Sequence, residues 1–176
     1  VLLSVYGGPE HQAVFKEFAT NPFDQYLVQE GYIVVYVNNR GGSSYGSDFK
    51  TCVYEQLGKW ECHDFAQAAT YVSTMPWADK DRIGIYGHSY GGFSAAYSIM
   101  EYPELYKTAI IAAPVTDWRN YDAIYTERFM GLLPQNKVKY DKASILSRVS
   151  KLNDKVLIAH SAYDDNVHVK NTMQLL

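Results

Sequence analysis

Cysteine is scarce in this chain, which contains only Cys52 and Cys62. Two cysteines are too few for a disulfide framework or a cysteine-based metal site, so we expect two unpaired thiols. Long hydrophobic runs are also lacking, and no segment approaches the ~20 apolar residues that a bilayer-spanning helix needs. Basic residues do not gather in runs, and the formal net charge is -3. This charge pattern argues against a nucleic-acid-binding surface.

Apolar and aromatic residues are plentiful: 47% of the 176 residues are hydrophobic, and sixteen are tyrosine. This composition disfavours disorder, and the length suits one domain with a substantial core. Apolar, β-prone runs alternate with stretches whose apolar residues recur at helical spacing. Unbroken apolar strands are typical of a mostly parallel sheet with helices on both faces, which is the α/β class. The expected strands are 1–6, 32–37, 82–86, 108–113 and 155–160.

The chain begins at Val1 without an initiator methionine, inside an expected strand, and ends at Leu176, inside an expected helix. We therefore expect residues 1–176 to be one partial domain of a longer protein, truncated at both ends. A tyrosine-rich insertion with helix-forming patches covers residues 115–151, between the fourth and fifth expected strands.

Residues 87–92 read Gly-His-Ser-Tyr-Gly-Gly and lie between an apolar run and a helical pattern. A Gly-x-Ser-x-Gly turn between a strand and a helix is the nucleophile elbow. Such a turn strains the serine backbone, and side chains at positions 87 or 91 would collide with the neighbouring strand and helix. We therefore predict that Ser89 is a nucleophile near the positive end of the following helix. The alternative is a glycine-rich turn in which Ser89 only caps that helix.

A serine nucleophile needs a base to take its proton and an acid to orient that base. In elbow hydrolases the acid follows the last strand, where Asp164 and Asp165 lie in a polar loop. The alternative for this pair is a solvated turn. The base should be a histidine beyond the acid, but His168, the only one there, is too close along the chain. We therefore expect the catalytic base to lie outside this chain.

An oxyanion hole needs two hydrogen-bond donors close to the nucleophile. The backbone N–H of Tyr90, the residue after Ser89, is the first expected donor. The second should come from the loop after the first strand, where the Tyr6 hydroxyl is available. The alternative is that Tyr6 is only an amphipathic residue at a strand end.

Five segments together resemble a known family, and they span essentially the whole chain. The most specific, residues 113–131, reads APVTDWRNYDAIYTERFMG, and the others are 5–9, 39–41 followed by Leu57, Gly58 and Asp64, 81–87 and 164–168. They resemble the catalytic domain of the prolyl oligopeptidase family, and specifically its dipeptidyl peptidase IV branch. The long run at 113–131 separates this branch from generic esterases.

The resemblance implies an α/β-hydrolase fold with Ser89 as nucleophile and Asp164 as triad acid. It also implies an oxyanion hole formed by the Tyr6 hydroxyl and the Tyr90 N–H, while Asn166 would bind a substrate carbonyl. Flat aromatic walls suit a rigid pyrrolidine ring; the alternative is that these aromatics are ordinary core. The implied S1 pocket, small and shaped for proline, is lined by Val115, Trp118, Tyr121, Tyr125 and Val167.

The activity implied by the resemblance is that of a serine exopeptidase. It would release dipeptides from peptides with Pro, or less well Ala, second from the N-terminus, without a cofactor or metal. The alternatives are an acylaminoacyl-peptidase or prolyl endopeptidase of the same family, or a non-catalytic relative that acts as a binding partner. The family's β-propeller would precede Val1 and its triad histidine would follow Leu176, so we expect this chain to be inactive alone. Relatives are often homodimers found outside the cytoplasm, as periplasmic, secreted or membrane-anchored proteins, and the same is expected of the parent.

Three residues depart from the pattern of that branch. His88 stands where the branch usually has Trp, and Ser161 and Tyr163 stand where Gly and Ala are typical. None of them occupies a triad position, although Tyr163 could crowd the acid loop.

Overall fold

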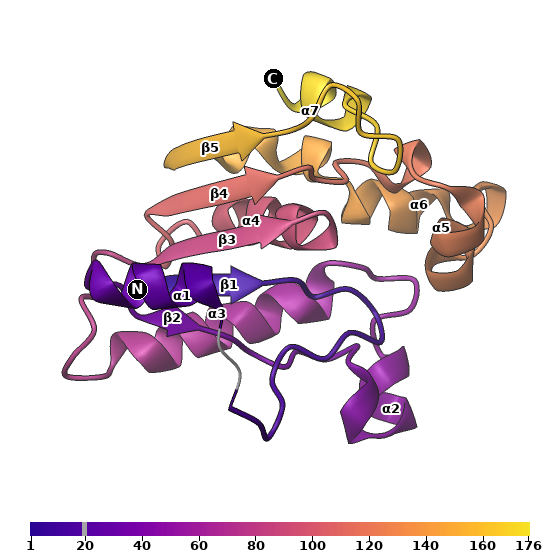
Figure 1. Cartoon of the computed structure of the whole chain (residues 1–176). Helices are drawn as coiled ribbons and strands as arrows, with labels where there is room; N and C mark the ends of the chain where they lie inside the picture. The colour runs from indigo at the N-terminus through magenta and orange to yellow at the C-terminus, as the bar shows by residue number, and fades with distance from the viewer. Residues whose placement is uncertain (19–20) are drawn as a thin grey trace.

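A computed structural model describes residues 1–18 and 21–176 of the chain. Its centre is a five-stranded sheet in the order β2-β1-β3-β4-β5, in which every neighbouring pair is parallel (Figure 1). The carboxyl ends of all five strands therefore lie at the same end of the sheet. Their bounds are β1 Leu2–Val5, β2 Val34–Val35, β3 Gly84–His88, β4 Thr108–Ala112 and β5 Lys155–Ala159.

Helices occupy the connections between the strands. In Figure 1, α1 lies on one face of the sheet and α3 and α4 lie on the other, while α5 and α6 lie beyond the strand ends. This arrangement confirms the predicted α/β class. The α-helices are α1 Pro22–Gln29, α2 Ser47–Thr51, α3 Lys59–Ser73, α4 Tyr90–Glu101, α5 Ala123–Met130, α6 Leu133–Ala143 and α7 Lys170–Leu175. The short 3-10 helices are η1 Ser43–Tyr45, η2 Trp118–Asn120 and η3 Ile145–Lys151.

Helix α4 is the centre of the core. Every residue from Tyr90 to Met100 is buried, because the helix packs against β3 and β4 on one side and against α3 on the other. Phe93, Ile85 and Ile111 are fully buried in this cluster. Burial of a large apolar side chain contributes about 1.5–3 kcal/mol, so the helix that follows Ser89 is held firmly in place.

The expected strand over 32–37 is much shorter in the structure. Only Val34 and Val35 pair with β1, opposite Leu2 and Leu3. The chain then leaves the sheet, and the Asn38 side chain accepts hydrogen bonds from the backbone N–H groups of residues 13 and 14. An edge strand has a partner on one side only, so a competing side-chain bond ends its pairing early.

In the part of the chain that the structure describes, the last strand, β5, pairs only with β4 and is the second edge strand of the sheet. Its side chains alternate between partly buried and exposed, and Leu157 is 61% exposed. Within the described residues, no helix combines the length and the apolar character that crossing a membrane requires.

Candidate active site

Ser89 occupies a sharp turn between β3 and α4. Its backbone has φ 60° and ψ -118°, which is a strained conformation for a residue with a Cβ atom. The Ser89 N–H donates to the carbonyl of Ala112 in β4 at 2.9 Å, which fixes the turn against the neighbouring strand. This is the geometry predicted for a nucleophile elbow, in which the turn raises the serine side chain above the strand ends.

The glycines of the elbow are required by close backbone contacts. A Cβ atom on Gly87 would lie 2.1 Å from the carbonyl oxygen of Gly91, and one on Gly91 would lie 2.3 Å from that of Val5. A Cβ on Gly92 would meet the carbonyl of Ala112 at 2.3 Å. The elbow is therefore wedged between β1 and β4, and a larger residue at these positions would force the backbone apart.

A small pocket opens beside Ser89. The Trp118 ring is stacked on Tyr125, with centroids 6.0 Å apart and an interplanar angle of 21°, and it lies edge-on to Tyr121 at 83°. Such walls are flat and apolar. The pocket is lined by Tyr6, Ser89, Tyr90, Val115, Trp118, Tyr121 and Tyr125.

The tyrosine hydroxyls at this pocket keep their protons at neutral pH. Burial, followed by the nearby Tyr121, raises the pKa of Tyr6. Burial also raises the pKa of Tyr90 and of Tyr125 well above the ordinary value. The hydroxyl of Tyr6 is therefore a hydrogen-bond donor, as an oxyanion hole requires.

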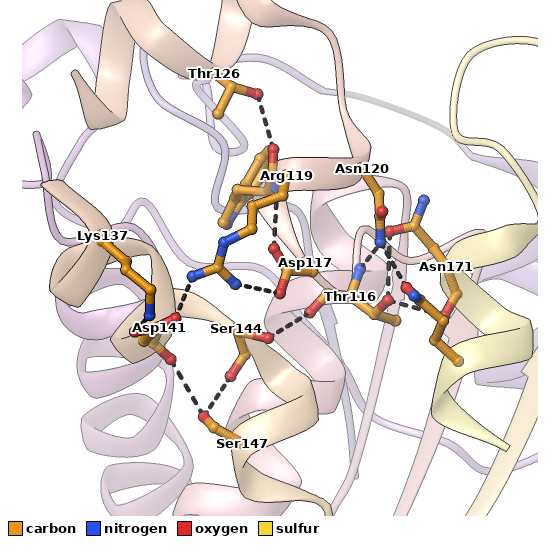
Figure 2. Close-up of polar contacts among 12 residues, drawn as sticks. Thr116, Asp117, Arg119, Asn120, Thr126, Lys137, Asp141, Ser144, Ser147 and Asn171 are labelled. Carbon is orange, nitrogen blue, oxygen red and sulfur yellow. Dashed lines mark hydrogen bonds and ion pairs between the residues drawn. The ribbon is translucent and has the colours of Figure 1, made fainter. Parts of the chain in front are cut away.

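The segment that carries Trp118 is tied to two other elements (Figure 2). Thr116 donates its backbone N–H to Oδ1 of buried Asn171 in α7 at 3.0 Å, and its hydroxyl donates to the Asn171 carbonyl at 2.8 Å. On the other side, the Arg119 guanidinium bridges Asp117, at 2.8 Å, and Asp141 of α6. These bonds hold the pocket wall in position relative to α6 and α7.

Asp164 and Asp165 differ in their surroundings. Oδ1 of Asp164 accepts the backbone N–H groups of Asn166 and Val167 at 3.0 and 2.9 Å. Asp165 is exposed and has no hydrogen bond within the described residues. Asp164 is thus the oriented carboxylate of the pair, and its Oδ2 forms no hydrogen bond within the described residues.

His160 is buried behind the acid loop. Its Nε2 donates to the carbonyl of Val167 at 2.7 Å, while Nδ1 lies 2.7 Å from the hydroxyl of Thr172. The same Nε2 lies 3.5 Å from Oδ2 of Asp164. The His160 ring thus supports the loop that carries Asp164.

The other predicted site residues lie close to this group. Asn166 accepts a hydrogen bond from the Tyr121 hydroxyl at 2.8 Å, which links the acid loop to the pocket wall. Val167 is 2% exposed and packs in the core rather than among the residues lining the pocket. Tyr163 is 96% exposed and therefore does not crowd Asp164, and His88 is exposed as well.

Within residues 1–18 and 21–176, no histidine ring forms a hydrogen bond with Ser89. Both ring nitrogens of His160 are occupied, and Nδ1 of His168 accepts the backbone N–H of Lys170 at 3.1 Å. In the same part of the chain, no three His, Cys, Asp or Glu side chains are grouped to hold a metal ion.

No sequence pattern singles out Glu61, which lies behind Tyr90 and accepts a hydrogen bond from the Tyr90 hydroxyl at 2.6 Å. An isolated glutamate in a polar stretch is typical of a surface position. A larger cavity of about 530 Å³ lies elsewhere, between the start of α3 and α6, and is lined by Lys59, Lys139, Lys142 and Arg148 among others. It contains no residue of the elbow.

Proteins of known family resemble this chain over its whole length. The family model described as "Prolyl oligopeptidase family" matches residues 18–176. A protein of Trichophyton verrucosum described as a probable dipeptidyl-aminopeptidase B is 42% identical over 179 residues, which cover 100% of this chain and 20% of that protein. One from Metarhizium robertsii with the same description is 38% identical, with the same two coverages.

Among solved structures, the crystal structure of Porphyromonas gingivalis dipeptidyl peptidase 4 superposes with a TM-score of 0.95 at 40% identity. The match covers 99% of this chain and 25% of that one, so the chain spans about a fifth to a quarter of the length of these relatives. The expected α/β-hydrolase fold is confirmed by this match and by the parallel sheet. The chain belongs to the prolyl oligopeptidase family.

Proposed function

We propose that the longer protein containing this chain is a serine exopeptidase of the dipeptidyl peptidase IV type. It releases dipeptides from peptides with Pro or Ala second from the N-terminus. The observation that carries this proposal is the pairing of a strained serine elbow with a small pocket walled by Trp118, Tyr121 and Tyr125. The names of the relatives, dipeptidyl-aminopeptidase B and dipeptidyl peptidase 4, support the same activity.

Ser89 is the proposed nucleophile. Its Oγ forms a bond to the carbonyl carbon of the second substrate residue, while its proton passes to a histidine outside this chain. The Tyr6 hydroxyl and the Tyr90 N–H donate to the resulting oxyanion. The peptide C–N bond then breaks, and the histidine returns the proton to the leaving amine. A water molecule hydrolyses the acyl-enzyme by the same route and restores the Ser89 hydroxyl.

Asp164 is the proposed triad acid. Two backbone N–H groups hold its Oδ1, so that Oδ2 can orient the histidine and stabilise its imidazolium form. Asn166 is proposed to bind a substrate carbonyl, and its bond to Tyr121 supports a position beside the pocket. Val115, Trp118, Tyr121 and Tyr125 are proposed to line the S1 site for the proline ring, and Val167, buried in the same apolar cluster, is proposed to support this lining from the core.

Two alternatives make different demands on the substrate. An acylaminoacyl-peptidase or prolyl endopeptidase would keep the elbow but accept a blocked amino terminus. A non-catalytic binding relative would not acylate Ser89 at all. We further propose that residues 1–176 are inactive alone, because the catalytic histidine lies outside them. The parent protein is proposed to be a homodimer, and sedimentation of the full-length protein tests this.

The full-length protein should be assayed with Gly-Pro-p-nitroanilide and with its N-acetylated form, using Ser89→Ala as the control. Release of the chromophore from the free-amine substrate alone, lost in the variant, is the expected result. Cleavage of the blocked substrate would move the parent to the endopeptidase or acylaminoacyl-peptidase group. Absence of both activities, together with no Ser89-dependent labelling by a fluorophosphonate, would overturn the proposal in favour of a binding protein.

A further inference from the structure

Glu61 lies in the first turn of α3 and is completely buried, with 0% of its surface exposed. Its Oε1 accepts two hydrogen bonds, from the Tyr90 hydroxyl at 2.6 Å and from the backbone N–H of Gly58 at 3.2 Å. The first joins α3 to the residue directly after the nucleophile. A bond this short between two buried groups is a strong local constraint.

Few contacts offset the cost of burying the rest of the Glu61 carboxyl. Within the described residues, Oε2 has no hydrogen-bond partner and Glu61 takes part in no ion pair. Arg40, a nearby cation, is paired with Asp64 at 2.5 Å instead. Burial raises the pKa of Glu61 to about 7. A buried carboxyl with an unpaired oxygen destabilises a fold, so its place in the core needs a reason other than stability.

The position of Tyr90, the partner of Glu61, gives a reason for this buried carboxyl. Its ring packs against Trp118, with centroids 5.3 Å apart, and against Tyr6 at 5.9 Å, so it touches both the pocket wall and the proposed oxyanion tyrosine. Its backbone N–H belongs to the first residue of α4, next to Ser89. Rotation of this ring would therefore disturb the pocket, the Tyr6 hydroxyl and the oxyanion N–H together.

We propose that Glu61 is a positioning residue for acyl transfer: its carboxylate holds the Tyr90 hydroxyl and thereby fixes the ring and backbone of Tyr90 beside Ser89. This inference rests on the proposed peptidase function. Glu61 touches neither substrate nor reacting atoms and acts only through Tyr90. Its bond to Gly58 is a separate structural role at the start of α3.

A double-mutant cycle in the full-length protein separates the two roles. Tyr90→Phe, Glu61→Leu and the double variant are compared with the unchanged enzyme by kcat/KM on Gly-Pro-p-nitroanilide, with melting curves giving the folded fraction of each. We expect each single change to lower kcat/KM about tenfold, and the double variant to lose no more than the worse single one, because both remove one interaction. Glu61→Gln, which keeps an acceptor for the hydroxyl, should restore kcat/KM to within about threefold of the unchanged enzyme.

Several results would overturn the inference. One is a double variant whose loss equals the product of the two single losses; another is a Glu61→Gln variant as impaired as Glu61→Leu. If Glu61→Leu does not fold, Tyr90→Phe still decides. Tyr90→Phe should also lower the preference for Gly-Pro over Gly-Ala substrates, and a Tyr90→Phe variant equal to the unchanged enzyme in kcat/KM and in this preference contradicts the inference.

Tyr97→Phe, on the same helix but bonded to Arg148, is the matched control and should behave as the unchanged enzyme. If the unchanged protein cleaves neither substrate, the proposed function fails; if it is active but the cycle is multiplicative, only the role of Glu61 fails.

Discussion

At the scale of single residues, the site combines groups that would be unfavourable in an ordinary core. Ser89 has a backbone conformation that costs about 1–3 kcal/mol. Glu61 is a fully buried carboxyl with one unpaired oxygen. Well-packed surroundings stabilise both residues, since α4 is buried along almost its whole length. Both residues lower the stability of the fold, and both lie beside the pocket, where their geometry shapes the site.

The strain at Ser89 leads to a prediction about stability. Ser89→Gly and Ser89→Ala should both abolish activity, but only glycine adopts a positive φ without a steric cost. After subtraction of the extra chain entropy of glycine, we expect the glycine variant to be more stable than the alanine variant by about 1 kcal/mol. Thermal unfolding of the full-length protein measures this difference.

Ser98, in the regular part of α4, is the matched control for that comparison. There the order should reverse, with Ser98→Gly less stable than Ser98→Ala, because glycine weakens a helix interior. An alanine variant at position 89 that is more stable than the glycine variant would show that the elbow is not strained in solution.

The raised pKa of Glu61 predicts a pH dependence of stability. Between the pKa of an unfolded glutamate and about 7, the folded protein holds this proton and the unfolded chain does not. The free energy of unfolding should therefore fall as pH rises through this window, by up to roughly 3 kcal/mol from this group. In Glu61→Gln that part of the dependence should vanish. Unfolding midpoints at pH 5 and pH 7.5 test this, and an identical midpoint difference in both proteins would contradict it.

At the scale of elements, the pocket wall depends on bonds that bring distant segments together. The Thr116 N–H is buried and is paired with Asn171 of α7, while Asp117 and Asp141 hold Arg119 on the other side (Figure 2). None of these contacts is local in sequence except the pair between Asp117 and Arg119. The position of the pocket wall is therefore coupled to the position of α7.

Asn171→Ala removes the acceptor of the buried Thr116 N–H. An unpaired buried donor costs about 1–3 kcal/mol, and we expect the free energy of unfolding to fall by that amount, with a raised KM for proline substrates. Asn120→Ala is the matched control, because Asn120 also bonds α7, through Gln174, but at the surface. Equal effects of the two changes on unfolding would contradict the importance of the buried contact.

At the scale of the whole molecule, the five-stranded sheet has an open edge at β5. Within residues 1–18 and 21–176, this strand pairs only with β4, and Leu157 is 61% exposed on it. An apolar edge strand offers unpaired backbone groups to other chains.

We therefore expect the 176-residue chain, when produced alone, to self-associate through β5. Leu157→Lys should shift it toward monomer, because a charge on an edge strand opposes pairing between sheets. Sedimentation velocity measures the shift. Ile124→Lys, an equally apolar and even more exposed position on α5, should leave the association unchanged, and an equal effect there would mean that the contact is not made by the sheet edge.

Much of this architecture was predictable from the sequence, because apolar periodicity and glycine spacing are local signals. The strands around Ile85 and Ile111 and the elbow at Ser89 follow from such signals. The aromatic pocket walls of the insertion were expected from the family resemblance instead. The strand order and the early end of β2 depend on contacts between distant segments. Glu61 could not be predicted for the same reason, since its partner Tyr90 is far away in the sequence.

The strand order also has a consequence for synthesis of the protein. β1 lies inside the sheet between β2 and β3, and Leu2 pairs with Gly84. A nascent chain that has emerged only as far as β2 therefore carries an apolar strand with one side unpaired. Non-local parallel pairing forms slowly, and exposed strand edges favour aggregation in that interval. We expect a molecular chaperone that recognises short apolar segments to bind residues 2–5 until β3, the strand before Ser89, has left the ribosome.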